Sequence, residues 1–195
     1  MGKESHPPER SPSKSPQGDL ASVSSSRILV VEDYEPFRRR LCSLLSMRPD
    51  LQVIGEVSDG LAAVQKTEEL RPDVVLLDIG LPKLNGIEAA RRMRKLSPES
   101  RILFVSQESS VDVVEEAFRS GALGYVVKTN AGRELLDAVD AVRKGQQFLS
   151  GGLPTAVLCA AEAVPIDSFG QREDAPPLVP KKKGLPSRRG TIPSW

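Results

Sequence analysis

Five short apolar segments alternate along residues 26–150 with stretches whose apolar side chains recur at helical spacing. The segments are ILVV (28–31), LQVIGEV (51–57), DVVLLDI (73–79), RILFVS (101–106) and GYVVK (124–128). Segments this short and this continuously apolar are typical of strands buried on both faces of a parallel sheet. The alternation therefore predicts an α/β fold of five βα units, in which helices cover both faces of a doubly wound, five-stranded parallel sheet.

Between these segments, apolar side chains recur every three or four residues, as on one face of a helix. The five groups are Phe37, Leu41, Leu44 and Leu45; Ala63, Val64, Thr67 and Leu70; Ile87, Ala90 and Met93; Val114, Ala117 and Phe118; and Leu135, Val139 and Val142. A proline or glycine follows each group, where helices commonly end. Asp59, either Ser109 or Ser110, and Asn130 are the expected N-caps of the second, fourth and fifth helices.

Prolines divide the chain into a core and two tails. Four of the sixteen lie in residues 1–25, seven in 151–195 and only five in the 125 residues between. Residues 1–25 are rich in serine and proline without periodicity, a composition that does not bury enough apolar surface to offset the entropy of ordering. We therefore expect disorder in 1–25, one folded domain in 26–150, and a Pro-rich, mostly disordered segment in 151–195.

Composition excludes several classes of function. Residues 26–150 carry 18 lysines and arginines against 19 aspartates and glutamates, which is not the basic excess of a nucleic-acid-binding surface. His6 is the only histidine, and Cys42 and Cys159 form no CxxC pair, so structural zinc sites and Cys/His or Ser/His/Asp centres lack their parts. No apolar run approaches the ~20 residues of a membrane span, and the N-terminus lacks the apolar block of a signal peptide. We expect a cytoplasmic protein without a membrane partner.

Polar side chains of complementary chemistry follow four of the expected strands. Glu32 and Asp33 follow the first strand, Asp78 ends the third, Ser106 the fourth and Lys128 the fifth. Because the carboxyl ends of parallel strands meet at one edge, we expect these side chains in one crevice. Three converging carboxylates repel one another, and a hard divalent cation compensates them, which for a partly hydrated oxygen site means Mg²⁺. Beside a hydroxyl and an ammonium, such a site suits phosphoryl transfer, with the central Asp78 as nucleophile.

Four segments carry a resemblance to a known family. VEDYEPFRRRL (31–41), DVVLLDIGLPKLNGIEAARRMR (73–94), ILFVS (102–106) and GALGYVVK (121–128) resemble the receiver domain of two-component response regulators, over roughly residues 27–149. The resemblance implies the flavodoxin-like receiver fold. The closing segment RELLDAVDAVRKGQQFLS (133–150) is most similar to receivers that precede a helix-turn-helix DNA-binding domain. We expect no such output domain in residues 151–195, because seven prolines in that segment leave no room for three packed helices.

Carried over position by position, the resemblance makes Asp78 the phosphoacceptor. It implies that the carboxylates of Asp33 and Asp78 bind Mg²⁺, that Glu32 assists directly or through water, and that the backbone carbonyl of Gly80 completes the protein ligands. The phosphoryl donor is then a phosphohistidine on a separate sensor histidine kinase or phosphotransfer protein, since residues 26–150 contain no histidine.

The resemblance also implies how the phosphoryl group acts on the rest of the domain. Ser106 would donate a hydrogen bond to one phosphoryl oxygen and Lys128 would pair with another. Tyr125 matches an aromatic residue that changes rotamer when Ser106 is drawn toward the phosphoryl group. This switch would bias the surface of the fourth helix, fifth strand and fifth helix, which is where a downstream protein or a second copy, forming a homodimer, would bind.

We interpret the chain as a phosphorelay signalling switch that catalyses only its own phosphorylation and slow dephosphorylation, and not as an enzyme in the usual sense. One alternative is an interaction module with the same fold that works without phosphorylation; the complete set of site residues argues against it. A second is a DNA-binding transcriptional regulator, although the charge balance predicts no specific binding to nucleic acid. A dedicated phosphatase would lack its second acid two residues after Asp78, where Gly80 stands.

Overall fold

A computed structural model describes residues 25–155 of the chain. The expected disorder of residues 1–25 and 151–195 concerns segments that lie almost wholly outside the described residues. Eleven of the twelve elements are helices and strands of ordinary kind, in the order β1 (Ser26–Val31), α1 (Glu35–Leu45), β2 (Leu51–Val57), α2 (Gly60–Leu70), β3 (Val74–Leu77), α3 (Gly86–Leu96), β4 (Arg101–Ser106), α4 (Val111–Arg119), β5 (Gly124–Val127), α5 (Ala131–Arg143) and β6 (Phe148–Leu149). A single 3₁₀ turn, Lys128–Asn130, joins β5 to α5.

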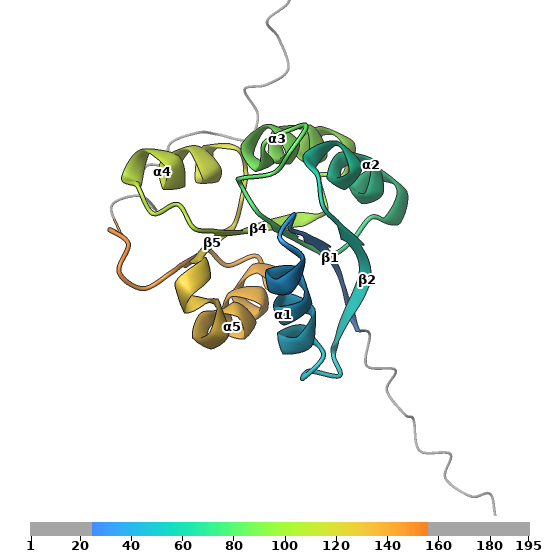
Figure 1. Ribbon diagram of the computed structural model, residues 1–195, viewed down its shortest axis with the longest axis horizontal. Coiled ribbons are helices and arrows are strands. Elements are labelled where there is room, and N and C mark those ends of the chain that lie inside the picture. Colours follow the sequence, from blue (N-terminus) through green and yellow to red (C-terminus); the bar gives the residue numbers. More distant parts are fainter. Residues whose placement is uncertain (1–24, 156–195) are drawn as a thin grey trace, which may run out of the picture.

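The strands form one parallel sheet in the order β2-β1-β3-β4-β5-β6. Helices α1 and α5 cover one face, and α2, α3 and α4 cover the other (Figure 1). The doubly wound α/β fold and its five expected strands are confirmed. The sixth strand was not predicted, because β6 is only two residues long and a two-residue apolar pair has no strand signature of its own. It covers the edge of β5, pairing Leu149 with Tyr125.

Two hydrophobic clusters lie on opposite faces of the sheet, and alternate residues of the same strands feed them. Leu29, Val75 and Phe104 enter the cluster under α2, α3 and α4. Their neighbours enter the cluster under α1 and α5, as Val74 and Leu103 do. All four residues of β3 are fully buried, which fixes β3 as a central strand.

Side-chain caps begin two of the helices. Asp59 caps α2 as expected, and Asn85 caps α3, each accepting a backbone N–H of the first turn at 2.9 Å. Ser110 and Asn130 occupy the expected N-cap positions of α4 and α5, but neither side chain accepts a cap hydrogen bond. These two positions were therefore predicted correctly and their capping hydrogen bonds were not.

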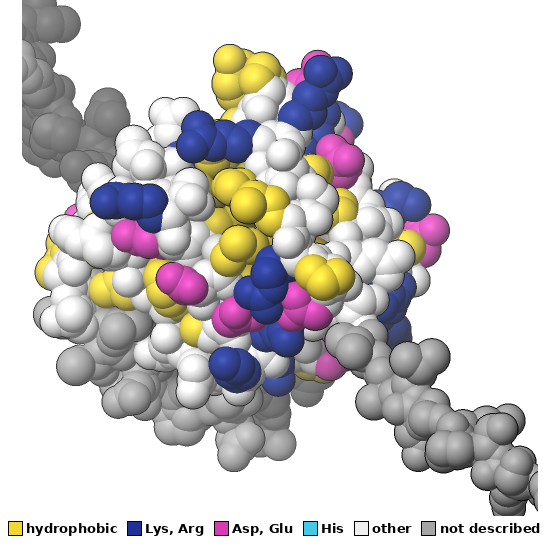
Figure 2. Space-filling model, turned by 90° about the horizontal axis from the view of Figure 1, so that it is seen from below, with side chains coloured by type: hydrophobic (Ala, Val, Ile, Leu, Met, Phe, Trp, Pro, Cys, Tyr) yellow, Lys and Arg dark blue, Asp and Glu magenta, His cyan; other side chains and the backbone are white. Residues whose placement is uncertain are grey.

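The strand order reverses direction between β1 and β3, and this places a crevice at the carboxyl ends of these two strands. Surface charges of both signs surround a central apolar area on the face seen in Figure 2. Among residues 25–155, no helix combines the length and the apolar character that a membrane crossing demands.

Candidate functional site

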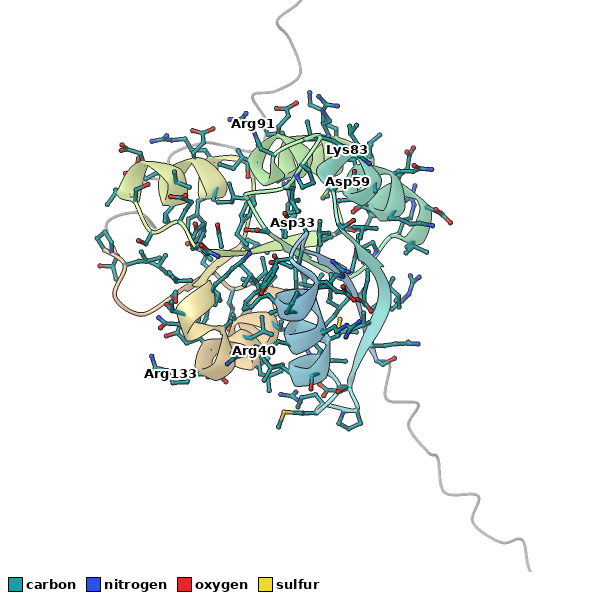
Figure 3. The ribbon with its side chains drawn as sticks, viewed as in Figure 1. Asp33, Arg40, Asp59, Lys83, Arg91 and Arg133 are labelled. Carbon is teal, nitrogen blue, oxygen red and sulfur yellow. The ribbon has the colours of Figure 1, made fainter. Side chains whose placement is uncertain are left out.

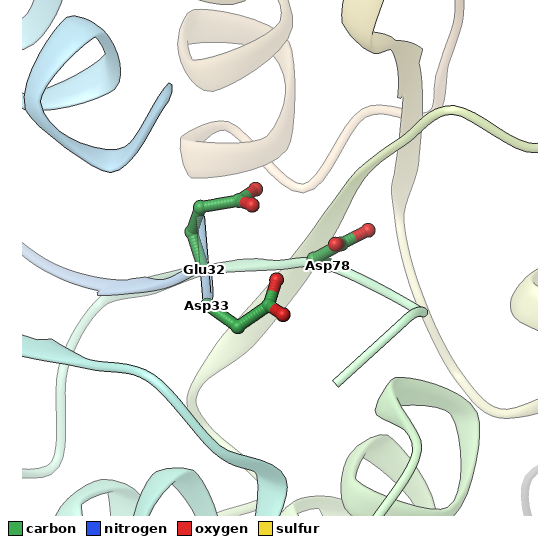
Figure 4. Close-up of side chains that lie close together, drawn as sticks. All are labelled: Glu32, Asp33 and Asp78. Carbon is green, nitrogen blue, oxygen red and sulfur yellow. The ribbon is translucent and has the colours of Figure 1, made fainter. Parts of the chain in front are cut away.

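Three carboxylates meet at the carboxyl end of β1 and β3. One oxygen from each of Glu32, Asp33 and Asp78 lies within 4.8 Å of the others, and Figure 4 shows the three side chains converging from the two strand ends. Backbone hydrogen bonds fix their positions, since Asp78 N donates to Val31 O at 3.0 Å and Glu32 N to Val57 O at 3.0 Å. Glu32 is fully buried and Asp78 nearly so, whereas Asp33 is exposed. The cluster is thus open to solvent on the Asp33 side.

Lys128 is the cation of this cluster. Its Nζ donates to Asp78 Oδ2 at 2.8 Å and to Glu32 Oε1 at 2.9 Å. It also lies 2.7 Å from Glu32 Oε2, but at an angle that makes no hydrogen bond, so this buried oxygen has no hydrogen-bond partner in the described part of the chain. On its other side, Nζ lies 5.0 Å from the centre of the Phe37 ring, which is within range of a cation–π contact.

Burial and charge perturb both members of the buried pair. Burial raises the pKa of Glu32, the Lys128 contact opposes this rise, and the nearby Asp78 charge adds to it. Burial by itself would lower the pKa of Lys128, but hydrogen bonds to Asp78 and Glu32 outweigh it and raise the pKa overall. The lysine therefore stays protonated at neutral pH, and one ammonium faces three acidic groups.

The oxygen atoms that this cluster offers are suitable ligands for a hard divalent cation. All three side chains offer carboxylate oxygens, the ligands that Mg²⁺ and Ca²⁺ prefer. Oε2 of Glu32 accepts no hydrogen bond in the described part of the chain, although the Lys128 ammonium lies 2.7 Å away, so it keeps a lone pair for a cation or a cation-bound water. Gly80 lies beside the cluster, since a Cβ built on it would stand 3.7 Å from Asp78 Oδ2. The lack of a side chain at this position leaves the approach to Asp78 open.

The two predicted switch residues lie on neighbouring strands and share a partner. Ser106 ends β4, is nearly buried, and its Oγ accepts from Glu108 N at 3.3 Å. Tyr125 on β5 is fully buried and its hydroxyl donates to Glu108 O at 2.9 Å. Burial raises the pKa of Tyr125 to about 12, against a lowering effect of a hydrogen bond with Ser106. The ring therefore points inward, below the loop that joins β4 to α4.

One residue of the site was missed from sequence. Phe37 was assigned only as an apolar position of the first helix, which it is, yet its ring also faces the Lys128 ammonium. The residue type carries no signal of this contact, because apolar positions on an amphipathic helix are normally core positions. Only the packing of α1 against the end of β5 reveals it.

Comparison with known proteins agrees with this geometry. A family model described as the response regulator receiver domain matches residues 28–140. The transcriptional regulatory protein LiaR of Bacillus subtilis (strain 168) is 34% identical over 152 residues, which are 75% of this chain and 72% of LiaR. The nitrate/nitrite response regulator protein NarL of Escherichia coli (strain K12) is 34% identical over 142 residues, 73% of this chain and 65% of NarL.

Solved structures give the same result. A LuxR-family two-component response regulator from Aurantimonas sp. SI85-9A1 matches with a TM-score of 0.63 and 30% identity, covering 71% of this chain and 96% of that one. The response regulator domain of Thermotoga maritima CheB matches with a TM-score of 0.58 and 34% identity, covering 62% of this chain and 97% of that one. The chain spans only part of the curated relatives, 72% of LiaR and 52% of DegU from Brevibacillus brevis among them. The chain belongs to the response regulator receiver domain family of two-component systems.

Proposed function

We propose that this chain is a phosphorylation-dependent signalling switch in which Asp78 accepts a phosphoryl group from the phosphohistidine of a sensor histidine kinase or a phosphotransfer protein. The observation that carries the proposal is the position of Asp78, between an acidic cluster suited to Mg²⁺ and the ammonium of Lys128 at 2.8 Å. The described residues contain no histidine, which supports a donor on another protein.

The chemistry follows from the charges. A carboxylate oxygen of Asp78 forms the new bond to phosphorus as the phosphorus–nitrogen bond of the donor histidine breaks, and the imidazole, whose other ring nitrogen already carries a proton, leaves as the neutral ring with the electron pair of that bond. Mg²⁺, held by Glu32, Asp33, Asp78 and the carbonyl of Gly80, would supply positive charge to the phosphoryl oxygens when it is bound. Lys128, freed from its contact with Asp78, would pair with one phosphoryl oxygen, and the hydroxyl of Ser106 would donate to another.

The output is a change of surface rather than a product released to solution. Drawing Ser106 Oγ toward the phosphoryl group would release its contact with Glu108 N, in the loop whose carbonyl holds the Tyr125 hydroxyl. Rearrangement of this loop would move the start of α4 and so alter the face formed by α4, β5 and α5. A downstream protein or a second copy of the chain would read that face, and the chain itself would act as a switch and not as a dedicated enzyme.

A beryllofluoride titration in Mg²⁺ tests the proposal, because this anion mimics a phosphoryl group on a carboxylate. We expect the NMR chemical shifts of the backbone amides of Ser106, Glu108 and Tyr125 to change until they saturate. We expect no such change in the Asp78→Asn variant. Partner binding that is the same with and without beryllofluoride would favour a phosphorylation-independent module. No change at any site amide in the wild-type chain would overturn the proposal.

Regulation of transcription is a second candidate function, and the names of the relatives favour it. LiaR is described as a transcriptional regulatory protein, and a 36% identical relative, DevR/DosR of Mycobacterium tuberculosis (strain ATCC 25618 / H37Rv), as a DNA-binding transcriptional activator. A gel-shift titration with duplex DNA at moderate salt, before and after phosphorylation, tests it directly. The near-neutral charge of residues 26–150 leads us to expect no specific shift.

A further inference from the structure

An ion pair joins two loops beside the acidic cluster. Lys83, in the loop between β3 and α3, places its Nζ 2.7 Å from Asp59 Oδ2, in the turn between β2 and α2. Figure 3 shows Lys83 and Asp59 next to each other, above Asp33 in that view. The loop that carries Lys83 begins with Asp78, directly after β3, and contains Gly80, so the pair belongs to the segment that would supply two of the metal ligands.

Asp59 is well placed to hold a partner. Its Oδ1 accepts from Ala62 N at 2.9 Å as the N-cap of α2, which fixes the carboxylate and leaves Oδ2 for Lys83. The Asp59 side chain is only 12% exposed, whereas that of Lys83 is 63% exposed. A rigid, largely buried carboxylate thus anchors the exposed and otherwise flexible lysine.

The backbone conformation of Lys83 is unusual for a residue with a side chain. Lys83 has φ +65°, in the left-handed region that a residue with a side chain rarely adopts. Such a conformation persists only where surrounding contacts outweigh its strain, and the strain is typical of functional loops. The ion pair with Asp59 is a contact of this kind, since it acts on the strained residue itself.

Backbone contacts extend the same junction. Gly60 N donates to Pro82 O at 3.3 Å, and a Cβ on Gly60 would stand 1.9 Å from Leu84 O, so the first residue of α2 lies directly against the loop. At the far end of the loop, Gly86 N donates to Ile79 O at 2.9 Å. The segment from Ile79 to Gly86 is therefore closed on itself and attached to α2 at its middle.

We propose that Asp59 and Lys83 are positioning residues for the cation site: by tying the loop at 79–86 to the N-terminus of α2, they hold Gly80 and Asp78 in the geometry that binds a divalent cation. This inference rests on the proposed Mg²⁺-dependent function. The pair touches neither the cation nor the phosphoryl group. Because the ion pair already holds the loop in place, less conformational entropy is lost when the cation binds.

The test measures Mg²⁺ affinity of the full chain, by competition with a metal-sensitive dye, in single variants that remove the ion pair and little else. Asp59→Asn keeps an acceptor for the helix cap and removes the charge, and Lys83→Met keeps the aliphatic stem and removes the ammonium. We expect each to weaken Mg²⁺ binding by about two- to fivefold, because the ion pair has one exposed member and acts on the ligands only through the loop. Lys83→Arg, which keeps the cation, is expected to bind nearly as the wild type does.

Lys66→Met is the matched control, because Lys66 forms an ion pair with Glu69 on α2, away from the loop, and is similarly exposed. We expect no change in Mg²⁺ affinity for this variant. Combining Asp59→Asn with Lys83→Met is expected to add little to either single loss, because both remove one interaction. If the substitutions destabilised the whole fold instead, the melting temperatures of both variants would fall.

The outcomes separate this inference from the proposed function. Wild-type Mg²⁺ affinity in both Asp59→Asn and Lys83→Met would overturn the positioning role and leave the proposed function intact. Independent, additive losses in the double variant would also overturn it. A wild-type chain that binds no Mg²⁺ would instead contradict the proposed function on which the inference rests.

Discussion

Lys128 holds together two carboxylates that would otherwise repel each other where β1 and β3 end. Its hydrogen bonds to Glu32 and Asp78 use two of its three protons, and the Phe37 ring lies against its remaining side. The cluster still carries more negative than positive charge, because Asp33 lies in it without a cation of its own among its described contacts. The three carboxylates therefore repel one another, and the proposed divalent cation would relieve that repulsion.

Asp33→Asn is expected to raise the melting temperature in EDTA, because it removes one of three clustered charges. The same substitution is expected to abolish most of the stabilisation by Mg²⁺, since it also removes a ligand. At a Mg²⁺ concentration tenfold above its Kd, linkage gives the wild type about 1.4 kcal/mol. Thermal melts with and without Mg²⁺ measure both effects, and equal Mg²⁺ gains in the two proteins would contradict the assignment of Asp33.

Tyr125→Phe is expected to lower the free energy of unfolding by about 1 kcal/mol, because it deletes the hydrogen bond from the buried hydroxyl to Glu108 O. Urea unfolding monitored by circular dichroism measures this loss. Tyr34→Phe is the control, since Tyr34 is 62% exposed and its change is expected to be small. Equal stability of Tyr125→Phe and the wild type would show that the hydroxyl bond contributes nothing in solution.

At the scale of elements, the junction of β3 and α3 sets the geometry of the site. The helix begins at Gly86, whose missing side chain lets it pack on the backbone of Asp78 and Ile79. A Cβ at Gly86 would stand 2.0 Å from Asp78 O, whereas one at Gly80 would meet nothing closer than 3.7 Å. A side chain at position 86 would therefore clash with the backbone directly after β3, whereas a small side chain at position 80 would fit.

Gly86→Ala is expected to destabilise the fold by about 1–3 kcal/mol, because helix and strand must move apart to admit the methyl group. Since that movement displaces Asp78, Mg²⁺ affinity is expected to fall as well. Gly80→Ala is the control for stability and is expected to change it by less than ~0.5 kcal/mol. Chemical unfolding of both variants checks this, and similar losses in the two would contradict it.

Whether a helix or strand could be predicted from the sequence depended on its length and on the elements that pack against it. The five longer strands were predicted to within two residues at each end, since short apolar segments of this kind have few other interpretations. β6 could not be predicted, because the pairing of Phe148 and Leu149 with β5 depends on how α5 directs the chain back to the sheet. The Asn85 cap was missed for a similar reason, as asparagine in a loop is equally common in turns.

The strand topology made the acidic residues of the site predictable from the sequence. The prediction missed the contacts that depend on packing geometry. Parallel strands place Glu32, Asp33 and Asp78 at one edge whatever the details of packing, and the structure brings them together. Their roles in metal binding and phosphorylation stay predictions, as do those of Ser106 and Lys128. The contacts of Phe37 with Lys128 and of Asp59 with Lys83 depend on loop conformations and helix packing, which residue types alone do not specify.

At the scale of the whole domain, a charge network opposite the site joins distant parts of the chain. Arg48 and Asp50 lie in the connection from α1 to β2, and each pairs with a residue of α5: Arg48 lies 3.1 Å from Asp140 and Asp50 lies 2.6 Å from Arg143. Hydrogen bonds from Arg48 and Arg143 hold the pKa of Asp50 well below its usual value. The network ties the ends of two helices that cover the same face of the sheet.

The lowered pKa of Asp50 sets the sign of a pH effect. The unfolded state binds the proton more readily, so this contribution to stability is present above the ordinary aspartate pKa of 3.8 and is lost as pH falls through the lowered folded-state value. Asp50→Asn is therefore expected to lose less stability than the wild type when pH falls from roughly 6 to 3. Denaturant unfolding across this range measures it, and parallel curves would contradict the network's role.

Phosphorylation of Asp78 is the central claim, and intact-protein mass spectrometry tests it most directly. After incubation with acetyl phosphate and Mg²⁺, we expect the full chain to gain the mass of one phosphoryl group. The gain should disappear in EDTA and in the Asp78→Asn variant, whose folding is checked by its melting curve. No added mass in the wild type, or the same added mass in Asp78→Asn, would contradict the claim.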